Sequence, residues 1–217
     1  MTAPFNPGEY TLKNSFLHLN NLHFQWKLSF VIIVSTLLII IERYHTIFPD
    51  KTADHFFLFL VLPLVTVLFI FREKPSLYGF QVGDWRAGLV FSLAGCIITL
   101  MIMLFVAQMN DFKAYYAPQA EPILQLTVRT GLDLFGWEFL FRGFLLFALF
   151  PVCGPYAILL QAVPFTIAHI GKPELETVSC IFGGSLFGYI AWRTRSFFYP
   201  FIIHWFLAII TILIASS

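Results

Sequence analysis

The chain has 217 residues, of which 59% are hydrophobic and 12% are charged, and its mean hydropathy is +0.80. A soluble domain has about 45–50% apolar and about 25% charged residues, so this composition predicts an integral membrane protein. The net charge of +1 provides no basic field for nucleic acid. Three cysteines without CxxC spacing argue against both a disulfide framework and a zinc cluster.

Seven apolar stretches, or eight if the longest is divided, predict an all-α bundle of transmembrane helices. They lack the alternation of strands, which argues against a β-barrel. The expected spans cover residues 28–41 (extended by their flanks to 24–44), 56–71, 87–107, 123–150, 156–170, 177–192 and 197–215.

The organisation around these spans is simple. Residues 1–26 are expected to form a tail or an interfacial segment, and residues 27–217 a single transmembrane domain. Segments 76–86 and 111–122 are expected to be loops. The distribution of Lys and Arg favours a cytoplasmic N-terminus.

The longest span carries charged residues in the middle of an apolar helix. Glu138 and Arg142 lie at i and i+4 and are expected to pair on one helix face. Ionisable groups inside a membrane are costly and usually mark a functional interior. Arg129 and Asp133 have the same spacing, and mutual pairing near the interface is the simpler interpretation for them.

Two later spans each supply one histidine. His169 ends a Phe-x-x-x-His pattern that starts at Phe165, and His204 begins a His-x-x-x-Ala pattern that ends at Ala208. A Glu and a His on facing helices deprotonate water, and a second His stabilises an oxyanion. Glu138, His169 and His204 are equally a three-ligand set for a catalytic zinc ion, and both interpretations stay open.

Other polar residues offer weaker alternatives. Glu174 and Glu176 follow a Gly-Lys-Pro break, so both are expected in a solvated loop unless Glu176 turns inward as a second carboxylate. Ser185 with His204 would resemble a rhomboid-type dyad, but Leu186 stands where rhomboids have glycine. A transporter or channel is disfavoured because no repeated half is evident.

These motifs, in this order, resemble the CPBP family of intramembrane proteases. The family includes type II CAAX prenyl endopeptidases and Abi bacteriocin-immunity proteins, and shows Glu-Glu-x-x-x-Arg, Phe-x-x-x-His and His-x-x-x-Asn on successive membrane helices. The resemblance covers about residues 123–215. The matching positions are Glu138, Arg142, Phe165, His169 and His204, whereas Trp137 replaces the first Glu and Ala208 replaces the Asn.

The resemblance implies a glutamate-dependent or metal-dependent endopeptidase. In the family, the first Glu and the first motif His activate water, the second Glu pairs with the Arg, and the last His and Asn bind the oxyanion. With Trp137 in the first position, the chain either borrows a carboxylate, from Glu138 or Glu176, or is a catalytically impaired relative. Such a relative would bind a peptide, a bacteriocin or a membrane partner, as in self-immunity.

The resemblance also implies the surroundings of the site. Trp137, Phe165 and Ala208 are expected to line the substrate cavity. A divalent metal such as zinc is the one cofactor it allows, and the expected partners are membrane lipid and a membrane-bound or prenylated peptide. The expected location is a bacterial cytoplasmic membrane, with the oligomeric state left open.

Overall fold

A computed structural model describes residues 25–217, so the prediction for residues 1–26 lies almost entirely outside the described part of the chain. Within residues 25–217 the helices are joined by short connections and there is no strand, which confirms the predicted fold class. The helices are α2 (Trp26–Tyr44), α3 (Lys51–Phe56), η3 (Phe57–Val61), α4 (Leu62–Val65), η4 (Thr66–Phe71), η5 (Pro75–Tyr78), α5 (Trp85–Val106), α6 (Asn110–Tyr116), η6 (Ala117–Gln119), α7 (Ile123–Glu138), η7 (Phe139–Leu145), α8 (Leu146–Cys153), α9 (Tyr156–Leu160), α10 (Ala162–Ala168), α11 (Glu174–Thr194) and α12 (Phe198–Ala215).

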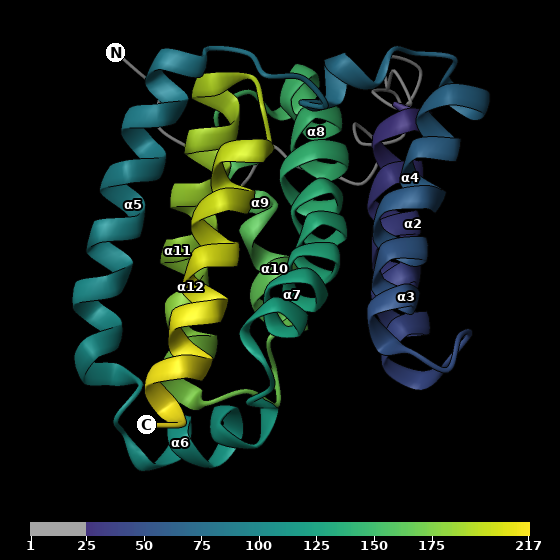
Figure 1. The fold of residues 1–217 in the computed structure, drawn as a ribbon. Helices are drawn as coiled ribbons and strands as arrows, with labels where there is room; N and C mark the ends of the chain where they lie inside the picture. Colours follow the sequence, from purple (N-terminus) through teal and green to yellow (C-terminus); the bar gives the residue numbers. More distant parts are fainter. Residues whose placement is uncertain (1–24) are drawn as a thin grey trace, which may run out of the picture.

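These helices join into long rods that run back and forth through the bundle (Figure 1). Each predicted span corresponds to one rod: α2, α3 through η4, α5, α7 through α8, α9 with α10, α11, and α12. Within the described residues, four rods are long and apolar enough to cross a membrane: Lys51–Phe71, Trp85–Val106, Ile123–Cys153 and Phe198–Ala215.

The rod from α7 to α8 forms the centre of the bundle. In its most apolar stretch 72% of the residues are buried, compared with 6% for α5. Figure 1 shows α5 at one edge and α2 to α4 at the opposite edge, with α7 between them. The outer surface of α5 therefore suits contact with lipid, whereas the central rod is enclosed by protein.

A π-helical segment interrupts the central rod. Residues 138–146 are all buried, and η7 takes up seven of them. Wide π turns are rare and often occur at functional sites. The sequence predicts one continuous helix over residues 123–150, and an ideal α-helix of about 100° per residue does not include such a segment.

Gly184 and Gly188 form a small-xxx-small pattern on α11 that permits close helix packing. A Cβ atom on Gly188 would lie 2.4 Å from Nε2 of Gln161, and one on Gly184 would lie 2.9 Å from the Phe165 ring. Glycine at both positions therefore lets α11 pack directly against α9 and α10.

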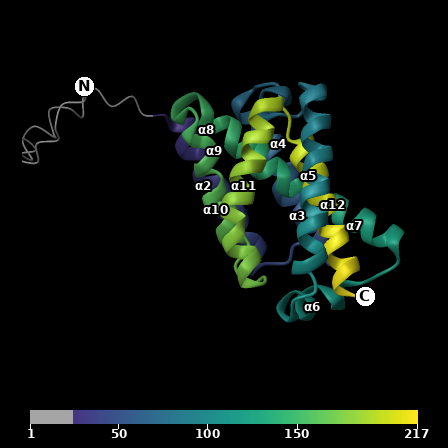
Figure 2. The same cartoon turned by 90° about the vertical axis from the view of Figure 1, so that its left-hand side faces the viewer.

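Three boundary predictions were wrong, and in each case local packing or capping explains the difference. The second rod begins at Lys51, five residues early, because the Asp50 side chain caps it by accepting from the Thr52 N–H at 3.2 Å. The expected loop 111–122 contains α6, whose Phe112 and Tyr116 are buried against α7 and α12. Figure 2 shows α6 at the end of the bundle where α12 finishes.

The third correction concerns the two glutamates expected in a solvated loop. Glu174 and Glu176 instead form the first turn of α11, directly after Pro173. Negative charge at this position is favourable because a helix N-terminus carries partial positive charge.

Candidate active site

Glu138 is the last residue of α7 and its side chain is fully buried. Its Oε1 lies 2.7 Å from Nδ1 of His204 on α12 and 3.3 Å from Nη1 of Arg142. Oε2 has no hydrogen-bond partner within residues 25–217. Because a carboxylate accepts, His204 donates from Nδ1, and in its neutral form it keeps a lone pair on Nε2.

Arg142 occupies an aromatic cage rather than a hydrogen-bonding site. Its guanidinium carbon lies 3.8 Å from the centre of the Phe165 ring and 5.4 Å from that of Phe187. None of its three guanidinium nitrogens makes a hydrogen bond in the described part of the chain. A buried charge pair costs free energy of desolvation, so this one is more readily explained by function than by stability.

His169 lies at the end of α10, and its Nδ1 is 2.8 Å from the Phe165 carbonyl oxygen. A carbonyl oxygen only accepts, so the proton is on Nδ1 and Nε2 carries a lone pair when the ring is neutral. The His169 and His204 rings lie 6.4 Å apart at 25°, and the Trp137 ring lies 5.6 Å from His169. The structure thus brings together residues from all three motifs, and their catalytic roles stay predictions.

The possible zinc set of Glu138, His169 and His204 is not arranged as a preformed metal site in the described residues. Among residues 25–217, no group of three His, Cys, Asp or Glu side chains is placed to hold a metal ion. Oε1 of Glu138 and Nδ1 of His204 bind each other instead of facing a shared point. Zinc binding at these residues stays a prediction.

Glu176 lies in a different network from Glu138. Its two carboxylate oxygens accept from Tyr116 Oη at 2.6 Å and from Lys172 Nζ at 3.0 Å. Burial raises the pKa of the Tyr116 hydroxyl and Glu176 raises it further, whereas burial lowers the pKa of Lys172 but Glu176 keeps it above the ordinary value. Glu176 is eight residues, about 12 Å of helix, from the part of α11 that contacts Arg142.

The remaining candidate residues, Ser185 and Ala208, make no hydrogen bond to the Glu138–His204 pair in the described residues. Ser185 donates to the Ile181 carbonyl at 2.6 Å and makes no hydrogen bond to His204 within the described residues, so the rhomboid-type dyad is not formed. Ala208, one turn beyond His204, is half-buried. An alanine side chain offers no hydrogen-bond donor in place of the family's Asn.

A second polar cluster was missed by sequence reasoning. Asp133 does not pair with Arg129, which contacts Glu121 instead. Asp133 contacts Nδ1 of His55 on α3, and Nε2 of that ring lies 2.9 Å from Oε1 of Glu42. The apolar pattern of the second span begins at residue 56 and therefore does not include His55, whereas α3 begins at Lys51 and places His55 on the helix.

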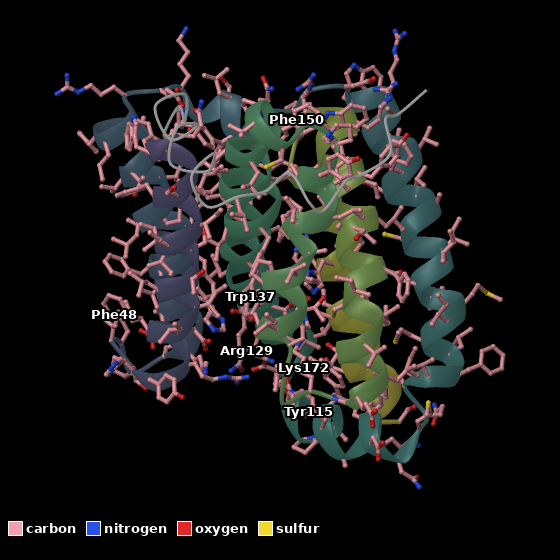
Figure 3. All side chains as sticks on the ribbon, turned by 180° about the vertical axis from the view of Figure 1, so that it is seen from behind. Phe48, Tyr115, Arg129, Trp137, Phe150 and Lys172 are labelled. Atoms are coloured by element: carbon pink, nitrogen blue, oxygen red, sulfur yellow. The ribbon has the colours of Figure 1, made fainter. Side chains whose placement is uncertain are left out.

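Trp137 connects the two clusters. Its Nε1 lies 3.1 Å from Nδ1 of His55, and its ring centre is 5.6 Å from those of both His55 and His169. Figure 3 shows Trp137 between the two sides of the bundle, with Arg129, Lys172 and Tyr115 nearer the end that α6 covers. Trp137, which replaces the family's first Glu, therefore packs between His55 of the second cluster and His169 of the candidate site.

The family match agrees with this site. Residues 119–210 match the family described as type II CAAX prenyl endopeptidase Rce1-like, which confirms over that region the resemblance inferred from the motifs. No curated protein and no solved structure matches the chain. Glu42 and His55 precede the matched region, whereas Asp133 and Trp137 lie within it.

Proposed function

We propose that the protein is an intramembrane endopeptidase that hydrolyses a peptide bond in a membrane-bound or prenylated peptide. The observation that carries this proposal is the buried hydrogen bond between Glu138 and His204, beside His169, inside the family-matched region. The protein crosses a bacterial cytoplasmic membrane several times, with its N-terminus in the cytoplasm. The four long apolar helices and the distribution of basic residues support that location.

In this proposal the Glu138–His204 pair activates water. Glu138 holds the His204 ring through Nδ1–H, so the Nε2 lone pair takes a proton from water. Nε2 of His169 accepts the second hydrogen of the same water and orients it. The hydroxide oxygen bonds to the carbonyl carbon of the peptide, and the carbonyl electron pair moves to its oxygen. Breaking the C–N bond then requires a proton on the departing nitrogen.

The test is cleavage of a quenched peptide panel that includes farnesylated C-terminal peptides, with protein reconstituted in lipid. We expect wild type to cleave, and Glu138→Gln and His204→Gln to lower kcat by about 10²- to 10⁴-fold. Glu174→Gln, on the exposed first turn of α11, serves as the matched control. A folded wild-type protein that cleaves no member of the panel would contradict the proposal.

Glu176 is included because the sequence offered it as a borrowed base. A loss of cleavage in Glu176→Gln comparable to that in Glu138→Gln would assign it this role. Its engagement by Tyr116 and Lys172 supports the opposite expectation, a smaller loss.

The second candidate function is a catalytically impaired relative that binds a peptide, a bacteriocin or a membrane partner. The substitutions at Trp137 and Ala208 favour it, because each removes a polar side chain that the family uses. Binding of the same peptides without cleavage, measured by photo-crosslinking and reduced in Trp137→Ala, would support this alternative.

A further inference from the structure

We propose that His55 is a pH-dependent switch whose Nδ1 atom bonds to Asp133 when the ring is charged and to Trp137 when the ring is neutral. These two hydrogen bonds exclude each other, because one needs a proton on Nδ1 and the other needs a lone pair there. The switch is a conformational device between α3 and α7. It goes beyond the proposed peptidase function and does not depend on it.

Two contacts hold the His55 ring in place whatever its charge. Its Nε2 donates to Oε1 of Glu42 at 2.9 Å, and both the neutral and the charged ring can make this bond. The ring also stacks on Phe59, with ring centres 5.4 Å apart and planes at 15°. Nδ1 is therefore directed at α7, where a change of protonation changes its partner.

The charged form of the ring suits Asp133. A charged imidazolium donates from both nitrogens, so Nδ1–H donates to Oδ1 of Asp133 while Nε2–H donates to Glu42. Lys51 Nζ lies 2.7 Å from the same Glu42 oxygen, so two cations then balance two carboxylates. In this state the Trp137 indole N–H faces another donor and makes no hydrogen bond to His55.

The neutral form of the ring suits Trp137. With its one proton on Nε2, the ring carries a lone pair on Nδ1. The Trp137 indole N–H, which only donates, lies 3.1 Å from that atom. The ionised Asp133 carboxylate would then face the lone pair and is repelled. Its side chain is 25% exposed, so water hydrates it once it leaves His55.

Other charged side chains on the two helices are engaged elsewhere. Asp54, which precedes His55 on α3, accepts from two backbone N–H groups of the connection before that helix. On α7, Arg129 lies one turn before Asp133 and contacts Glu121. Within the described part of the chain, the charge of the His55 ring is therefore set by the two carboxylates that it contacts and by Lys51.

The change of partner alters a contact of the candidate site. The Trp137 ring centre lies 5.6 Å from those of both His55 and His169. At low pH the indole beside His169 is released, while Asp133 ties α7 to α3. At high pH the indole is bound to His55 and the tie through Asp133 is lost. The pH therefore changes how firmly the side chain that packs against His169 is held.

The indole N–H signals of protein labelled with isotope-enriched tryptophan test the switch by NMR. Wild type is titrated in detergent micelles, and the Trp137 signal is assigned by its absence in Trp137→Phe. We expect its proton resonance to move downfield as the pH rises, because the N–H gains an acceptor. Trp205 is the control in the same spectrum, since its indole donates at 3.0 Å to the backbone carbonyl of Thr127, which does not titrate.

Substitutions in the cluster test the competition for Nδ1. Asp133→Asn removes an anion that favours the charged ring, so the Trp137 transition should move to lower pH by about one unit or more. His55→Gln should abolish the transition. Glu174→Gln is the control, because it removes an exposed carboxylate on the first turn of α11, and it should leave the midpoint unchanged.

Three results would overturn the proposal. The first is a Trp137 signal in wild type that moves with pH no more than that of Trp205. The second is a transition that persists in His55→Gln, and the third is a midpoint that Asp133→Asn leaves where it is. The first result needs no substitution in the cluster, so a variant that fails to fold does not protect the proposal. None of these measurements uses cleavage, so each is independent of the proposed function.

Discussion

The Arg142 side chain shows how a buried charge is accommodated when hydrogen bonds are missing. Its guanidinium lies over Phe165 and beside one oxygen of Glu138, and both charged side chains are fully buried. Stacking on an aromatic face favours a planar cation, and the carboxylate offsets its charge. The arrangement holds Glu138 in place while His204 uses the same oxygen.

Removing the cation alone should be costly. We expect Arg142→Met to lower the free energy of unfolding by about 3–5 kcal/mol, because it leaves the buried Glu138 carboxylate without its counter-charge. Adding Glu138→Gln should recover most of that loss. Arg129→Met is the control: its partly exposed pair with Glu121 should cost about 1 kcal/mol or less. Denaturant unfolding in detergent measures all four proteins, and equal losses in the two arginine variants would contradict the prediction.

The polar contacts could be predicted from the sequence only where both partners lie on one helix or in one motif. The pairing of Glu138 with Arg142 follows from their spacing of four residues on one helix. Asp133 was assigned to Arg129 by the same spacing, and this was wrong because His55 approaches from α3. Gly136 permits that approach, since a Cβ atom there would lie 2.9 Å from the His55 carbonyl oxygen. Spacing within one helix carries no information about a neighbouring helix.

At the scale of elements, two glycines allow α11 to pack closely against α9 and α10. Gly184 and Gly188 face α9 and α10, whereas a Cβ atom on Gly183 would meet nothing within 4 Å. This difference between neighbouring residues provides a matched pair for substitution.

We expect Gly184→Ala to destabilise the protein by about 1–3 kcal/mol, because the added methyl group would overlap the Phe165 ring. Gly183→Ala should be neutral or stabilise by up to about 1 kcal/mol, since alanine favours the helix and has space. Thermal unfolding in the same detergent compares the two. A Gly184→Ala protein as stable as Gly183→Ala would show that α11 is not tightly packed against α9 and α10.

The elements were predictable as spans but not in their fine geometry. Each rod was predicted from a long run of apolar residues, because a helix in a membrane needs such a run to face lipid or other helices. The early start of α3 depends on the Asp50 cap, and α6 depends on burying Phe112 and Tyr116 against helices distant in sequence. The π turns of η7 break the regular helical period, so a periodic pattern does not predict them.

At the scale of the whole molecule, charged pairs gather at the two ends of the bundle. Lys27 with Glu73 and Arg193 with Asp84 lie where α2 and α5 begin. Lys51 with Glu42 and Lys172 with Glu176 lie at the opposite end. Apolar rods whose exposed charged pairs lie at their ends, with the buried Glu138–Arg142 pair enclosed between helices, suit a bilayer with two aqueous faces.

This separation gives the proposed orientation a direct test. The end that carries Arg72, Lys74 and Arg86 should face the cytoplasm, because basic loops are retained there during insertion. Both Lys74 and Ala114 are exposed. Lys74 lies in the connection that leads to α5, and Ala114 lies on α6, at the opposite end of α5 (Figure 1). Each is therefore suitable for replacement by cysteine in a background where the native cysteines are serine. In intact bacterial cells, a membrane-impermeant maleimide should label Ala114→Cys and spare Lys74→Cys until the cells are opened. The reverse pattern would place α6, and with it the Glu176 network, on the cytoplasmic side and would contradict the proposed orientation.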